Sequence, residues 1–187
     1  MRLLTTLFVF LLQAPVSVAA PAILPVSVDI SVSGISLHDR TSQEQVLGAG
    51  IPFDKDADIP MAIFPSADGR QFLTVFTHPG GVGEISEFQI SYSVTKKPLA
   101  HRLKKVERFI SGQGIYLGLT KSHVTAILGA PLHQREEGGI VTLDYRLDET
   151  DQAAFEFLAR YKMPIYYGSY TFKSDRLVEF KFGFEYP

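Results

Sequence analysis

The sequence predicts an α+β fold of two tandem lobes, each with a short helical segment packed on one face of an antiparallel sheet. Two short patterns occur in the same order in both halves of the chain. Gly-Ile-x-Leu, followed by an aliphatic-Leu-Gly segment and a proline, spans residues 34–52 and recurs over 114–131. A strand-like pattern around a Glu-Phe pair spans residues 85–90 and recurs at 177–182. Such repetition is typical of a duplicated structural unit.

The first 19 residues have the features of an export signal. Arg2 is the only charged residue before position 20, residues 3–12 are mostly apolar, and small residues precede a cleavage site expected after Ala19. The apolar run is shorter than the ~20 residues of a membrane-spanning helix, although an uncleaved anchor is the alternative. We expect a signal peptide over residues 1–19 and an exported, periplasmic or secreted protein that is soluble after cleavage.

Charge is unevenly distributed along the rest of the chain. Residues 96–108 are basic, with Glu107 as their single acidic residue, whereas the remainder is acidic. We interpret residues 20–95 as the first lobe, 96–108 as a basic linker and 109–187 as the second lobe. The linker fits a solvated connection or a peripheral contact with an anionic membrane. The acidity and the export signal argue against nucleic acid binding.

The first lobe is expected to begin with a strand over residues 26–33, where apolar and polar side chains alternate. A helix follows, with Thr41 and Glu44 as a capping box and Gly48 at its end. Residues 51–69 then form an insert with an apolar stretch between two prolines. Phe64 in this stretch fits either an exposed anchor for a partner or a residue tucked back onto the core.

The second lobe repeats the helix. Thr120 is the expected N-cap, Val124, Ile127 and Leu128 share one helical face, and Gly129 ends the helix. Neither helix is long enough to be stable alone, so each must lie on a sheet. An added amphipathic helix is predicted over residues 148–161. Its expected inner side consists of Ala154, Phe155, Leu158 and Ala159.

Each lobe is predicted to end in a hairpin, formed by residues 72–77 and 85–92 in the first lobe and by 166–173 and 177–186 in the second. Alternation gives the last strand of each hairpin an apolar side for the core and a polar side for solvent. The core sides are Phe88, Ile90 and Tyr92 in the first lobe, and Val178, Phe180, Phe182, Phe184 and Tyr186 in the second. The polar sides supply the candidate binding residues Glu87, Gln89, Glu179, Lys181 and Glu185.

No pattern specific for catalysis or cofactor binding is present. Residues 54–58 begin like a calcium loop, but Ile59 and Pro65 stand where such a loop needs glycine and glutamate. The five histidines lack metal-ligand spacing, and no Gly-x-Ser-x-Gly motif occurs. The chain has no cysteine, so disulfides and an N-terminal lipid anchor are excluded. We expect no enzymatic activity, no cofactor and no metal.

The string Gly-Ile-x-Leu-Gly-x-Thr at residues 114–120, followed by Leu-Gly-x-Pro at 128–131, resembles the SmpA/OmlA (BamE-like) unit. In that family a Gly-aliphatic turn opens a helix that precedes a three-stranded sheet. The first repeat differs in having His38 where the second has Gly118. A tandem of such units is similar to the β-lactamase inhibitor protein (BLIP-like) superfold, which implies a concave sheet presented to a target. No binding residue is carried over from either family.

The sequence therefore predicts an exported, non-enzymatic protein-binding module with an envelope or inhibitor-like role. Its partner, a protein of the envelope, would meet the open sheet face and the inserted loops. The alternative is an envelope enzyme or small-ligand-binding protein that uses the interlobe cleft, with His78 or His123. The candidate partner-binding residues are Phe64, Glu87, Gln89, Glu179, Lys181 and Glu185.

Overall fold

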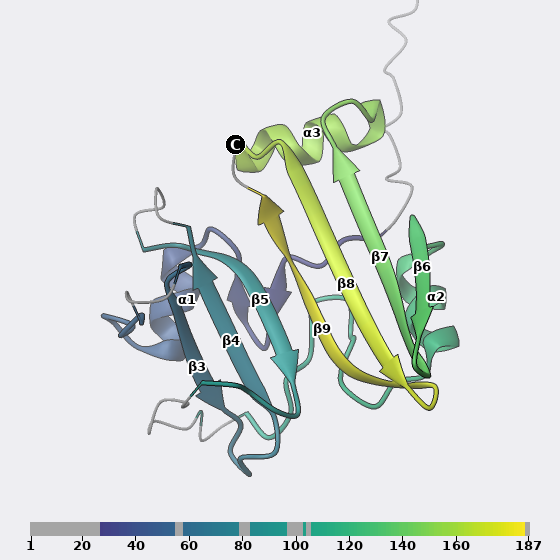
Figure 1. Cartoon of the computed structure of the whole chain (residues 1–187). Coiled ribbons are helices and arrows are strands. Elements are labelled where there is room, and N and C mark those ends of the chain that lie inside the picture. The colour runs from purple at the N-terminus through teal and green to yellow at the C-terminus, as the bar shows by residue number, and fades with distance from the viewer. Residues whose placement is uncertain (1–26, 55–57, 79–82, 97–102, 104–105, 186–187) are drawn as a thin grey trace, which may run out of the picture.

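The computed structural model of the chain describes residues 27–54, 58–78, 83–96, 103 and 106–185. Within these residues the fold is α+β, with three short helices, a seven-stranded antiparallel open sheet and a small hairpin (Figure 1). The α+β class predicted from the sequence is confirmed. The predicted signal peptide and most of the predicted basic linker lie outside the described residues.

One continuous sheet contains the strands of both halves of the chain. Its order is β3-β4-β5-β9-β8-β7-β6, and all neighbours are antiparallel. The two sheets expected from the sequence are thus joined edge to edge. The strands are β3 (Met61–Pro65), β4 (Phe72–Thr77), β5 (Ile85–Ser91), β6 (His133–Glu137), β7 (Ile140–Asp148), β8 (Ile165–Lys173) and β9 (Arg176–Glu185).

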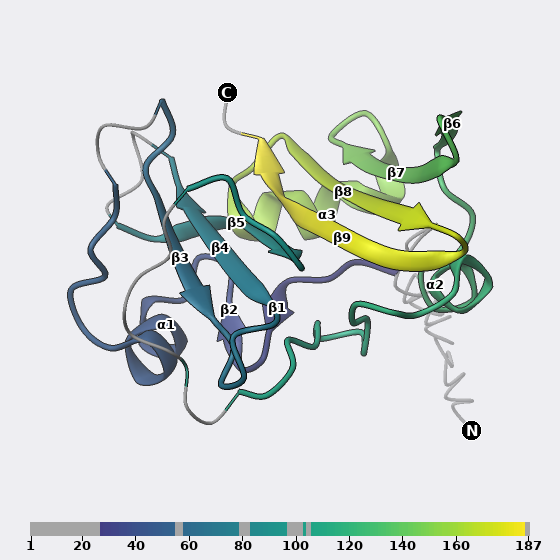
Figure 2. The same ribbon diagram turned by 60° about the horizontal axis from the view of Figure 1, so that its bottom comes forward.

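All three helices lie on the same side of this sheet, as Figure 2 shows. Helix α1 (Arg40–Leu47) lies behind the half made of β3, β4 and β5, and α2 (Lys121–Leu128) lies behind the other half (Figure 1). Helix α3 (Gln152–Tyr161) connects β7 to β8 and covers one end of the sheet. The opposite side, which faces the viewer in Figure 1, carries no helix among the described residues. We call it the open face.

Strands β5 and β9 form a seam between the two halves of the sheet. They contain the two copies of the strand repeat, and their register is symmetric with respect to that repeat. A local twofold axis therefore passes between Gln89 and Lys181. The pairs along the seam are Glu87 with Gly183, Phe88 with Phe182, Gln89 with Lys181, Ile90 with Phe180 and Ser91 with Glu179.

The two repeats also carry the same irregularity. The register between β4 and β5 shifts so that Ser86 is an extra, bulged residue, and the register between β8 and β9 shifts in the same way at Val178. Because the bulge interrupts the alternation, Leu177 is fully buried while Val178 is only partly buried. This corrects the prediction that Val178 lies on the core side. The first hairpin also ends before Tyr92, which is 47% exposed rather than in the core.

A turn before each helix contacts the last strand of its own repeat. The His38 backbone N–H donates to the Ile85 carbonyl at 3.0 Å, and the Gly118 N–H donates to the Leu177 carbonyl at 2.8 Å. Both donors have left-handed backbone geometry, with φ of 54° at His38 and 96° at Gly118. His38, which departs from the repeated pattern, therefore keeps the left-handed backbone conformation of Gly118. This conformation is unfavourable for a residue with a side chain.

The core lies between the helices and the sheet. Along the seam it contains Phe88, Phe180 and Phe182, which are fully buried, and the Phe88 and Phe182 rings meet edge to face with 5.6 Å between centroids. The Phe180 ring lies stacked beside Tyr170 at 5.9 Å. Burial of such large apolar side chains is the main stabilising contribution in a chain without disulfides. Phe180, Phe182 and Phe184 are therefore core, as predicted. Tyr186, which was predicted to share their side, lies outside the described residues.

The N-terminal described segment crosses to the second half of the chain. The predicted strand over residues 26–33 is reduced to β1 (Ser31–Val32), which pairs with β2 (Ile35–Ser36). Before it, Asp29 is buried, and its Oδ1 accepts a hydrogen bond from the Gln113 N–H at 2.7 Å. The Tyr166 hydroxyl donates to the Asp29 carbonyl at 2.9 Å. Burial raises the pKa of Asp29 to about 6, against the effect of its hydrogen bonds.

Two of the helix predictions need correction. Helix α1 begins at Arg40 and not after Thr41, because the Asp39 side chain accepts from the Thr41 N–H and serves as the N-cap. Glu44, which was expected to reach back to Thr41, forms an ion pair with Arg40 at 2.7 Å. Gly48 ends this helix as predicted.

Helix α2 has the predicted Thr120 N-cap and Gly129 end. In α3, which is shorter than predicted, Ala154 and Leu158 are buried as predicted, but Phe155 is 56% exposed and Ala159 is exposed. Phe157 and Tyr161 occupy the inner side instead, where both rings contact Phe184.

Candidate binding surface

The open face brings together five of the six residues predicted to bind a partner. They lie on β5 and β9, on the side opposite the aromatic core, because side chains alternate along each strand. They line two separate hollows on either side of the local twofold axis. The residues are Glu87, Lys181 and Glu185 in one hollow, and Gln89 and Glu179 in the other.

The larger hollow crosses the seam, and we call it the seam groove. It has a volume of about 520 Å³ and is open to solvent. Because it takes residues from β4, β5, β8 and β9, both halves of the chain contribute to it. Its lining residues are Ile59, Phe76, His78, Ser86, Glu87, Tyr167, Lys181, Phe184 and Glu185.

Glu87 has the most perturbed environment on the open face. Its side chain is largely buried, and burial raises its pKa to about 7, while the positive charge of Lys181 acts in the opposite direction. No hydrogen bond or ion pair joins its carboxylate to another residue in the described part of the chain. Near neutral pH Glu87 therefore exists as a mixture of the protonated and charged forms.

Gly183 creates the space that Glu87 occupies. It lies directly opposite Glu87 in the seam. A Cβ atom at position 183 would lie 2.4 Å from the Ser86 carbonyl oxygen and 2.8 Å from the Glu87 Cα. Both distances are far too short, and both neighbours are backbone atoms, so the seam has room only for glycine at this position.

The other charged groups at the seam groove already have partners. The Lys181 Nζ lies 5.6 Å from the centroid of the Tyr167 ring, a cation–π distance. Glu185 accepts two hydrogen bonds from the Arg146 guanidinium, at 2.8 and 3.2 Å. Tyr167 and Arg146 lie on β8 and β7 and were not predicted from the sequence. Their alternation with Tyr166 and Leu147, which are buried, is the signal that assigns them to the open face.

The second hollow lies beneath a chain segment, and we call it the crossing groove. It has a volume of about 280 Å³. The segment that follows β5 crosses the open face (Figure 1). Its Lys96 Nζ pairs with the Asp54 carboxylate at 3.0 Å. The lining residues include Met61, Ile63, Thr74, Gln89, Ser91, Val94 and Glu179.

Phe64 does not belong to this surface. It is 2% exposed and packs in the core from β3, on the side facing α1. Of the two alternatives for Phe64, the structure has the residue tucked back onto the core, which corrects its assignment as a partner-binding residue. The insert contributes Ile59 instead, which is 49% exposed and lines the seam groove.

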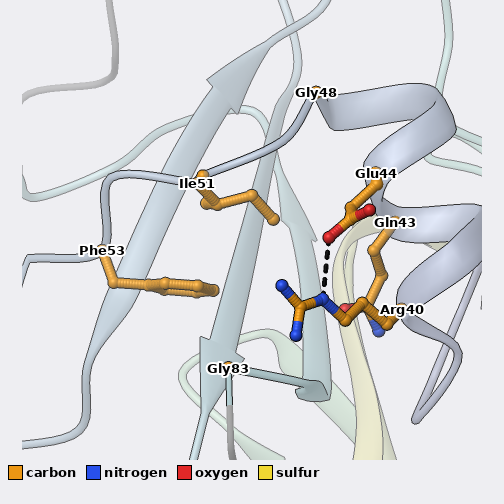
Figure 3. A pocket seen from close by; sticks show the side chains of 8 residues that line it. Arg40, Gln43, Glu44, Gly48, Ile51, Phe53 and Gly83 are labelled. Carbon is orange, nitrogen blue, oxygen red and sulfur yellow. Dashed lines mark hydrogen bonds and ion pairs between the residues drawn. The ribbon is translucent and has the colours of Figure 1, made fainter.

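A third hollow lies beside α1, away from the open face. Figure 3 shows the Arg40 side chain extending into it, paired with Glu44, with Ile51 and Phe53 on the facing side. Its volume of about 180 Å³ is the smallest of the three. An arginine that is already paired with a carboxylate leaves this hollow without a charge to offer a ligand.

The two histidines considered from the sequence lie apart. His78 lines the seam groove, whereas His123 lies on α2, where its Nδ1 is 2.6 Å from the Thr120 Oγ1. Among the described residues, no three His, Asp or Glu side chains are placed to hold a metal ion. The described helices are also too short and too polar to span a bilayer.

Comparison of the chain with protein-family models, curated proteins and solved structures gives no match.

Proposed function

We propose that the chain is an exported, non-enzymatic protein-binding module made of two BamE-like units in a BLIP-like tandem. A partner protein of the envelope would bind to its open face. The single observation that carries this proposal is the convergence of Glu87, Lys181 and Glu185 in one groove on the open face. A broad sheet face with two solvent-open grooves is well suited to a protein ligand, because each groove can accept one side chain.

The repeated bulge and the symmetric seam support the tandem arrangement. Each repeat has a helix with a glycine end, a turn bonded to the last strand, and a bulged strand at the seam. The basic linker, as a peripheral contact with anionic lipid, stays a prediction.

Partner capture with a charge swap tests the proposal. The mature chain serves as bait in the exported fraction of its host, beside the double variant Glu179→Lys, Lys181→Glu. A matched control swaps two exposed charges on α3, Glu156→Lys and Arg160→Glu, far from the open face. We expect a near-stoichiometric protein with wild type and with the α3 control, and its loss with the sheet-face variant. Equal capture by all three proteins would contradict the proposed surface.

A second candidate function follows from the composition of the seam groove. His78, Glu87 and Lys181 line the same hollow between the two halves of the chain, as a small-ligand or enzymatic site requires. This alternative predicts a small molecule that protects the seam groove from hydrogen exchange and an empty capture with folded bait.

A further inference from the structure

The seam groove is lined by a carboxylate that no described residue of the chain pairs with directly. Most of the Glu87 side chain is covered, yet no hydrogen bond or ion pair reaches its carboxylate from the described residues. Its carboxylate oxygens are not fully buried and open to the groove, where they keep contact with solvent. Partial removal of a carboxylate from water without a pairing cation is unfavourable. The geometry of the seam maintains this arrangement, because only glycine fits opposite Glu87.

The walls of the groove suit the hydrocarbon part of a long basic side chain. Phe76 and Tyr167 lie on the strands flanking the seam, and Ile59 is exposed in the lining. Lysine and arginine place their methylene groups along apolar surface and their charges against aromatic faces. The Tyr167 ring already has the Lys181 ammonium near it, which shows that it can take a cation.

The charges around the groove leave Glu87 as the group available to an incoming cation. Glu185 is held by two hydrogen bonds from Arg146. The nearest positive group, Lys181, lies by the Tyr167 ring and forms no ion pair with Glu87. A cation that reached Glu87 at hydrogen-bond distance would form a charge-assisted bond that the free protein lacks.

From these observations we infer that the seam groove receives one lysine or arginine side chain of the partner protein, with Glu87 as its counterion. The inference rests on the proposed function, since it assumes a protein partner on the open face. It adds the chemical class of the residue recognised there. Glu179, the equivalent of Glu87 in the other repeat, lines the crossing groove and is not assigned this role.

Binding of a cation should depend on pH, because it favours the charged form of Glu87. As pH rises from about 6 to about 8, the affinity of the seam groove for a cation should increase. The reason is that the bound cation displaces the proton of Glu87, and fewer molecules carry that proton at higher pH. Lys181, Glu185, His78 and Tyr167 also face the groove, so the pH dependence is assigned to Glu87 only by its loss in Glu87→Gln.

A blocked pentapeptide with one central arginine provides the probe, and the same peptide with neutral citrulline is its control. NMR titration follows the side-chain carboxyl carbon of Glu87 in the full mature chain. We expect the arginine peptide to lower the pKa of Glu87 by about half a unit or more, and the citrulline peptide to leave it unchanged. A lysine peptide should act like the arginine peptide.

Two isosteric variants complete the test. Glu87→Gln should weaken binding of the arginine peptide about tenfold, and Glu179→Gln should leave it unchanged. Equal effects of the arginine and citrulline peptides would overturn the inference. So would unchanged binding by Glu87→Gln, or the lack of any response at about 10 mM peptide, a concentration that detects a Kd of ~1 mM.

The outcomes separate this inference from the proposed function. If the partner is lost with the sheet-face charge swap while the arginine and citrulline peptides behave alike, the binding face stands and the basic-residue inference fails. If the arginine peptide binds through Glu87 while the swap leaves partner capture intact, the proposed face for the natural partner is wrong.

Discussion

At the scale of a single residue, Glu87 combines two opposing properties, an ionisable carboxylate and a largely buried side chain. It is a charged residue type on the polar side of a strand, yet the fold removes most of its contact with water. Its raised pKa means that folding favours the protonated form. The same burial that would make Glu87 a selective counterion therefore destabilises the free protein at neutral and alkaline pH.

The substitution Glu87→Gln should make the free energy of unfolding higher at pH 8 and less dependent on pH. The folded-state pKa of about 7 lies above the ordinary value of 4.5, so wild-type stability falls as pH rises between these two values. The loss levels off above pH 7 and amounts to at most about 3 kcal/mol. Urea unfolding of both proteins at pH 4, 6 and 8 measures the difference.

Asp29 also makes the protein less stable as pH rises, up to its folded-state pKa of about 6. The informative quantity is therefore the difference in the free energy of unfolding between wild type and variant. Glu179→Gln serves as the control, with no comparable gain expected. A wild-type protein that gained stability from pH 5 to pH 8 relative to Glu87→Gln would contradict this assignment.

Gly183→Ala should weaken the seam by about 3 kcal/mol, the upper end of the usual range for overpacking. The added methyl group would meet backbone atoms of Ser86 and Glu87, which cannot move without separating β5 from β9. Gly168→Ala is the matched control, because its nearest contact is a side-chain atom of Tyr170 at 3.1 Å. Denaturant titration gives both values, and hydrogen exchange should localise the Gly183 effect to β5. A smaller loss for Gly183→Ala than for Gly168→Ala would contradict this account.

At the scale of the elements, the stability of α1 and α2 depends on the residues that cap their ends. Helix α2 has a threonine N-cap whose Oγ1 accepts from the His123 N–H at 3.3 Å, and a glycine end. Neither α1 nor α2 exceeds eight residues, so neither would persist without its caps and the sheet beneath it.

Thr120→Ala should lower the free energy of unfolding by about 1 kcal/mol, because the first-turn N–H groups of α2 lose their side-chain acceptor. Thr120→Ser keeps the hydroxyl and should cost much less. Thermal unfolding of the three proteins provides the comparison. Equal losses for alanine and serine would mean that the threonine methyl group, and not the cap, matters here.

Much of the element order could be predicted from the sequence, because local chemistry decides it. Thr120, Gly129 and Gly48 mark helix ends by backbone rules that act over a few residues, and all three were predicted correctly. The Asp39 cap was missed because Thr41 and Glu44 offered a competing capping box two residues later. The bulges were missed because they are set by register with a neighbouring strand and not by the strand itself.

The candidate site was only partly predictable, for a related reason. Alternation placed Glu87, Lys181 and Glu185 on the polar side of their strands, and the structure brings them into one groove. The contribution of Tyr167 and Arg146 required the strand order, which no local pattern specifies. Phe64 was ambiguous because an apolar insert can be buried or exposed, and here β3 pairs with β4 and buries it.

At the scale of the whole molecule, the seam makes the two halves parts of one sheet. The aromatic core is continuous across it through Phe88, Phe180 and Phe182. Asp29 and Tyr166 join the N-terminal segment to the second half by hydrogen bonds. We therefore expect the halves to unfold together in a single transition, as small domains usually do.

Phe182→Ala should destabilise both halves by about 3–5 kcal/mol, as expected for loss of a buried phenylalanine. Hydrogen exchange should speed up alike at Leu73, in the first half, and at Leu143, in the second, both of which are fully buried. The exposed Phe155 provides a matched control, since Phe155→Ala removes the same atoms with little loss of buried area. Faster exchange in only one half would falsify the single-transition expectation.

The symmetric seam has the geometry of a homodimer contact contained within one polypeptide. Across a true twofold axis the central residue of the strand would face its own copy. Two identical β9 strands would then place Lys181 against Lys181, a repulsive pair, whereas the chain places Gln89 there. The difference between the repeats at this single position thus favours pairing of each half with the other and disfavours exchange of β9 between molecules.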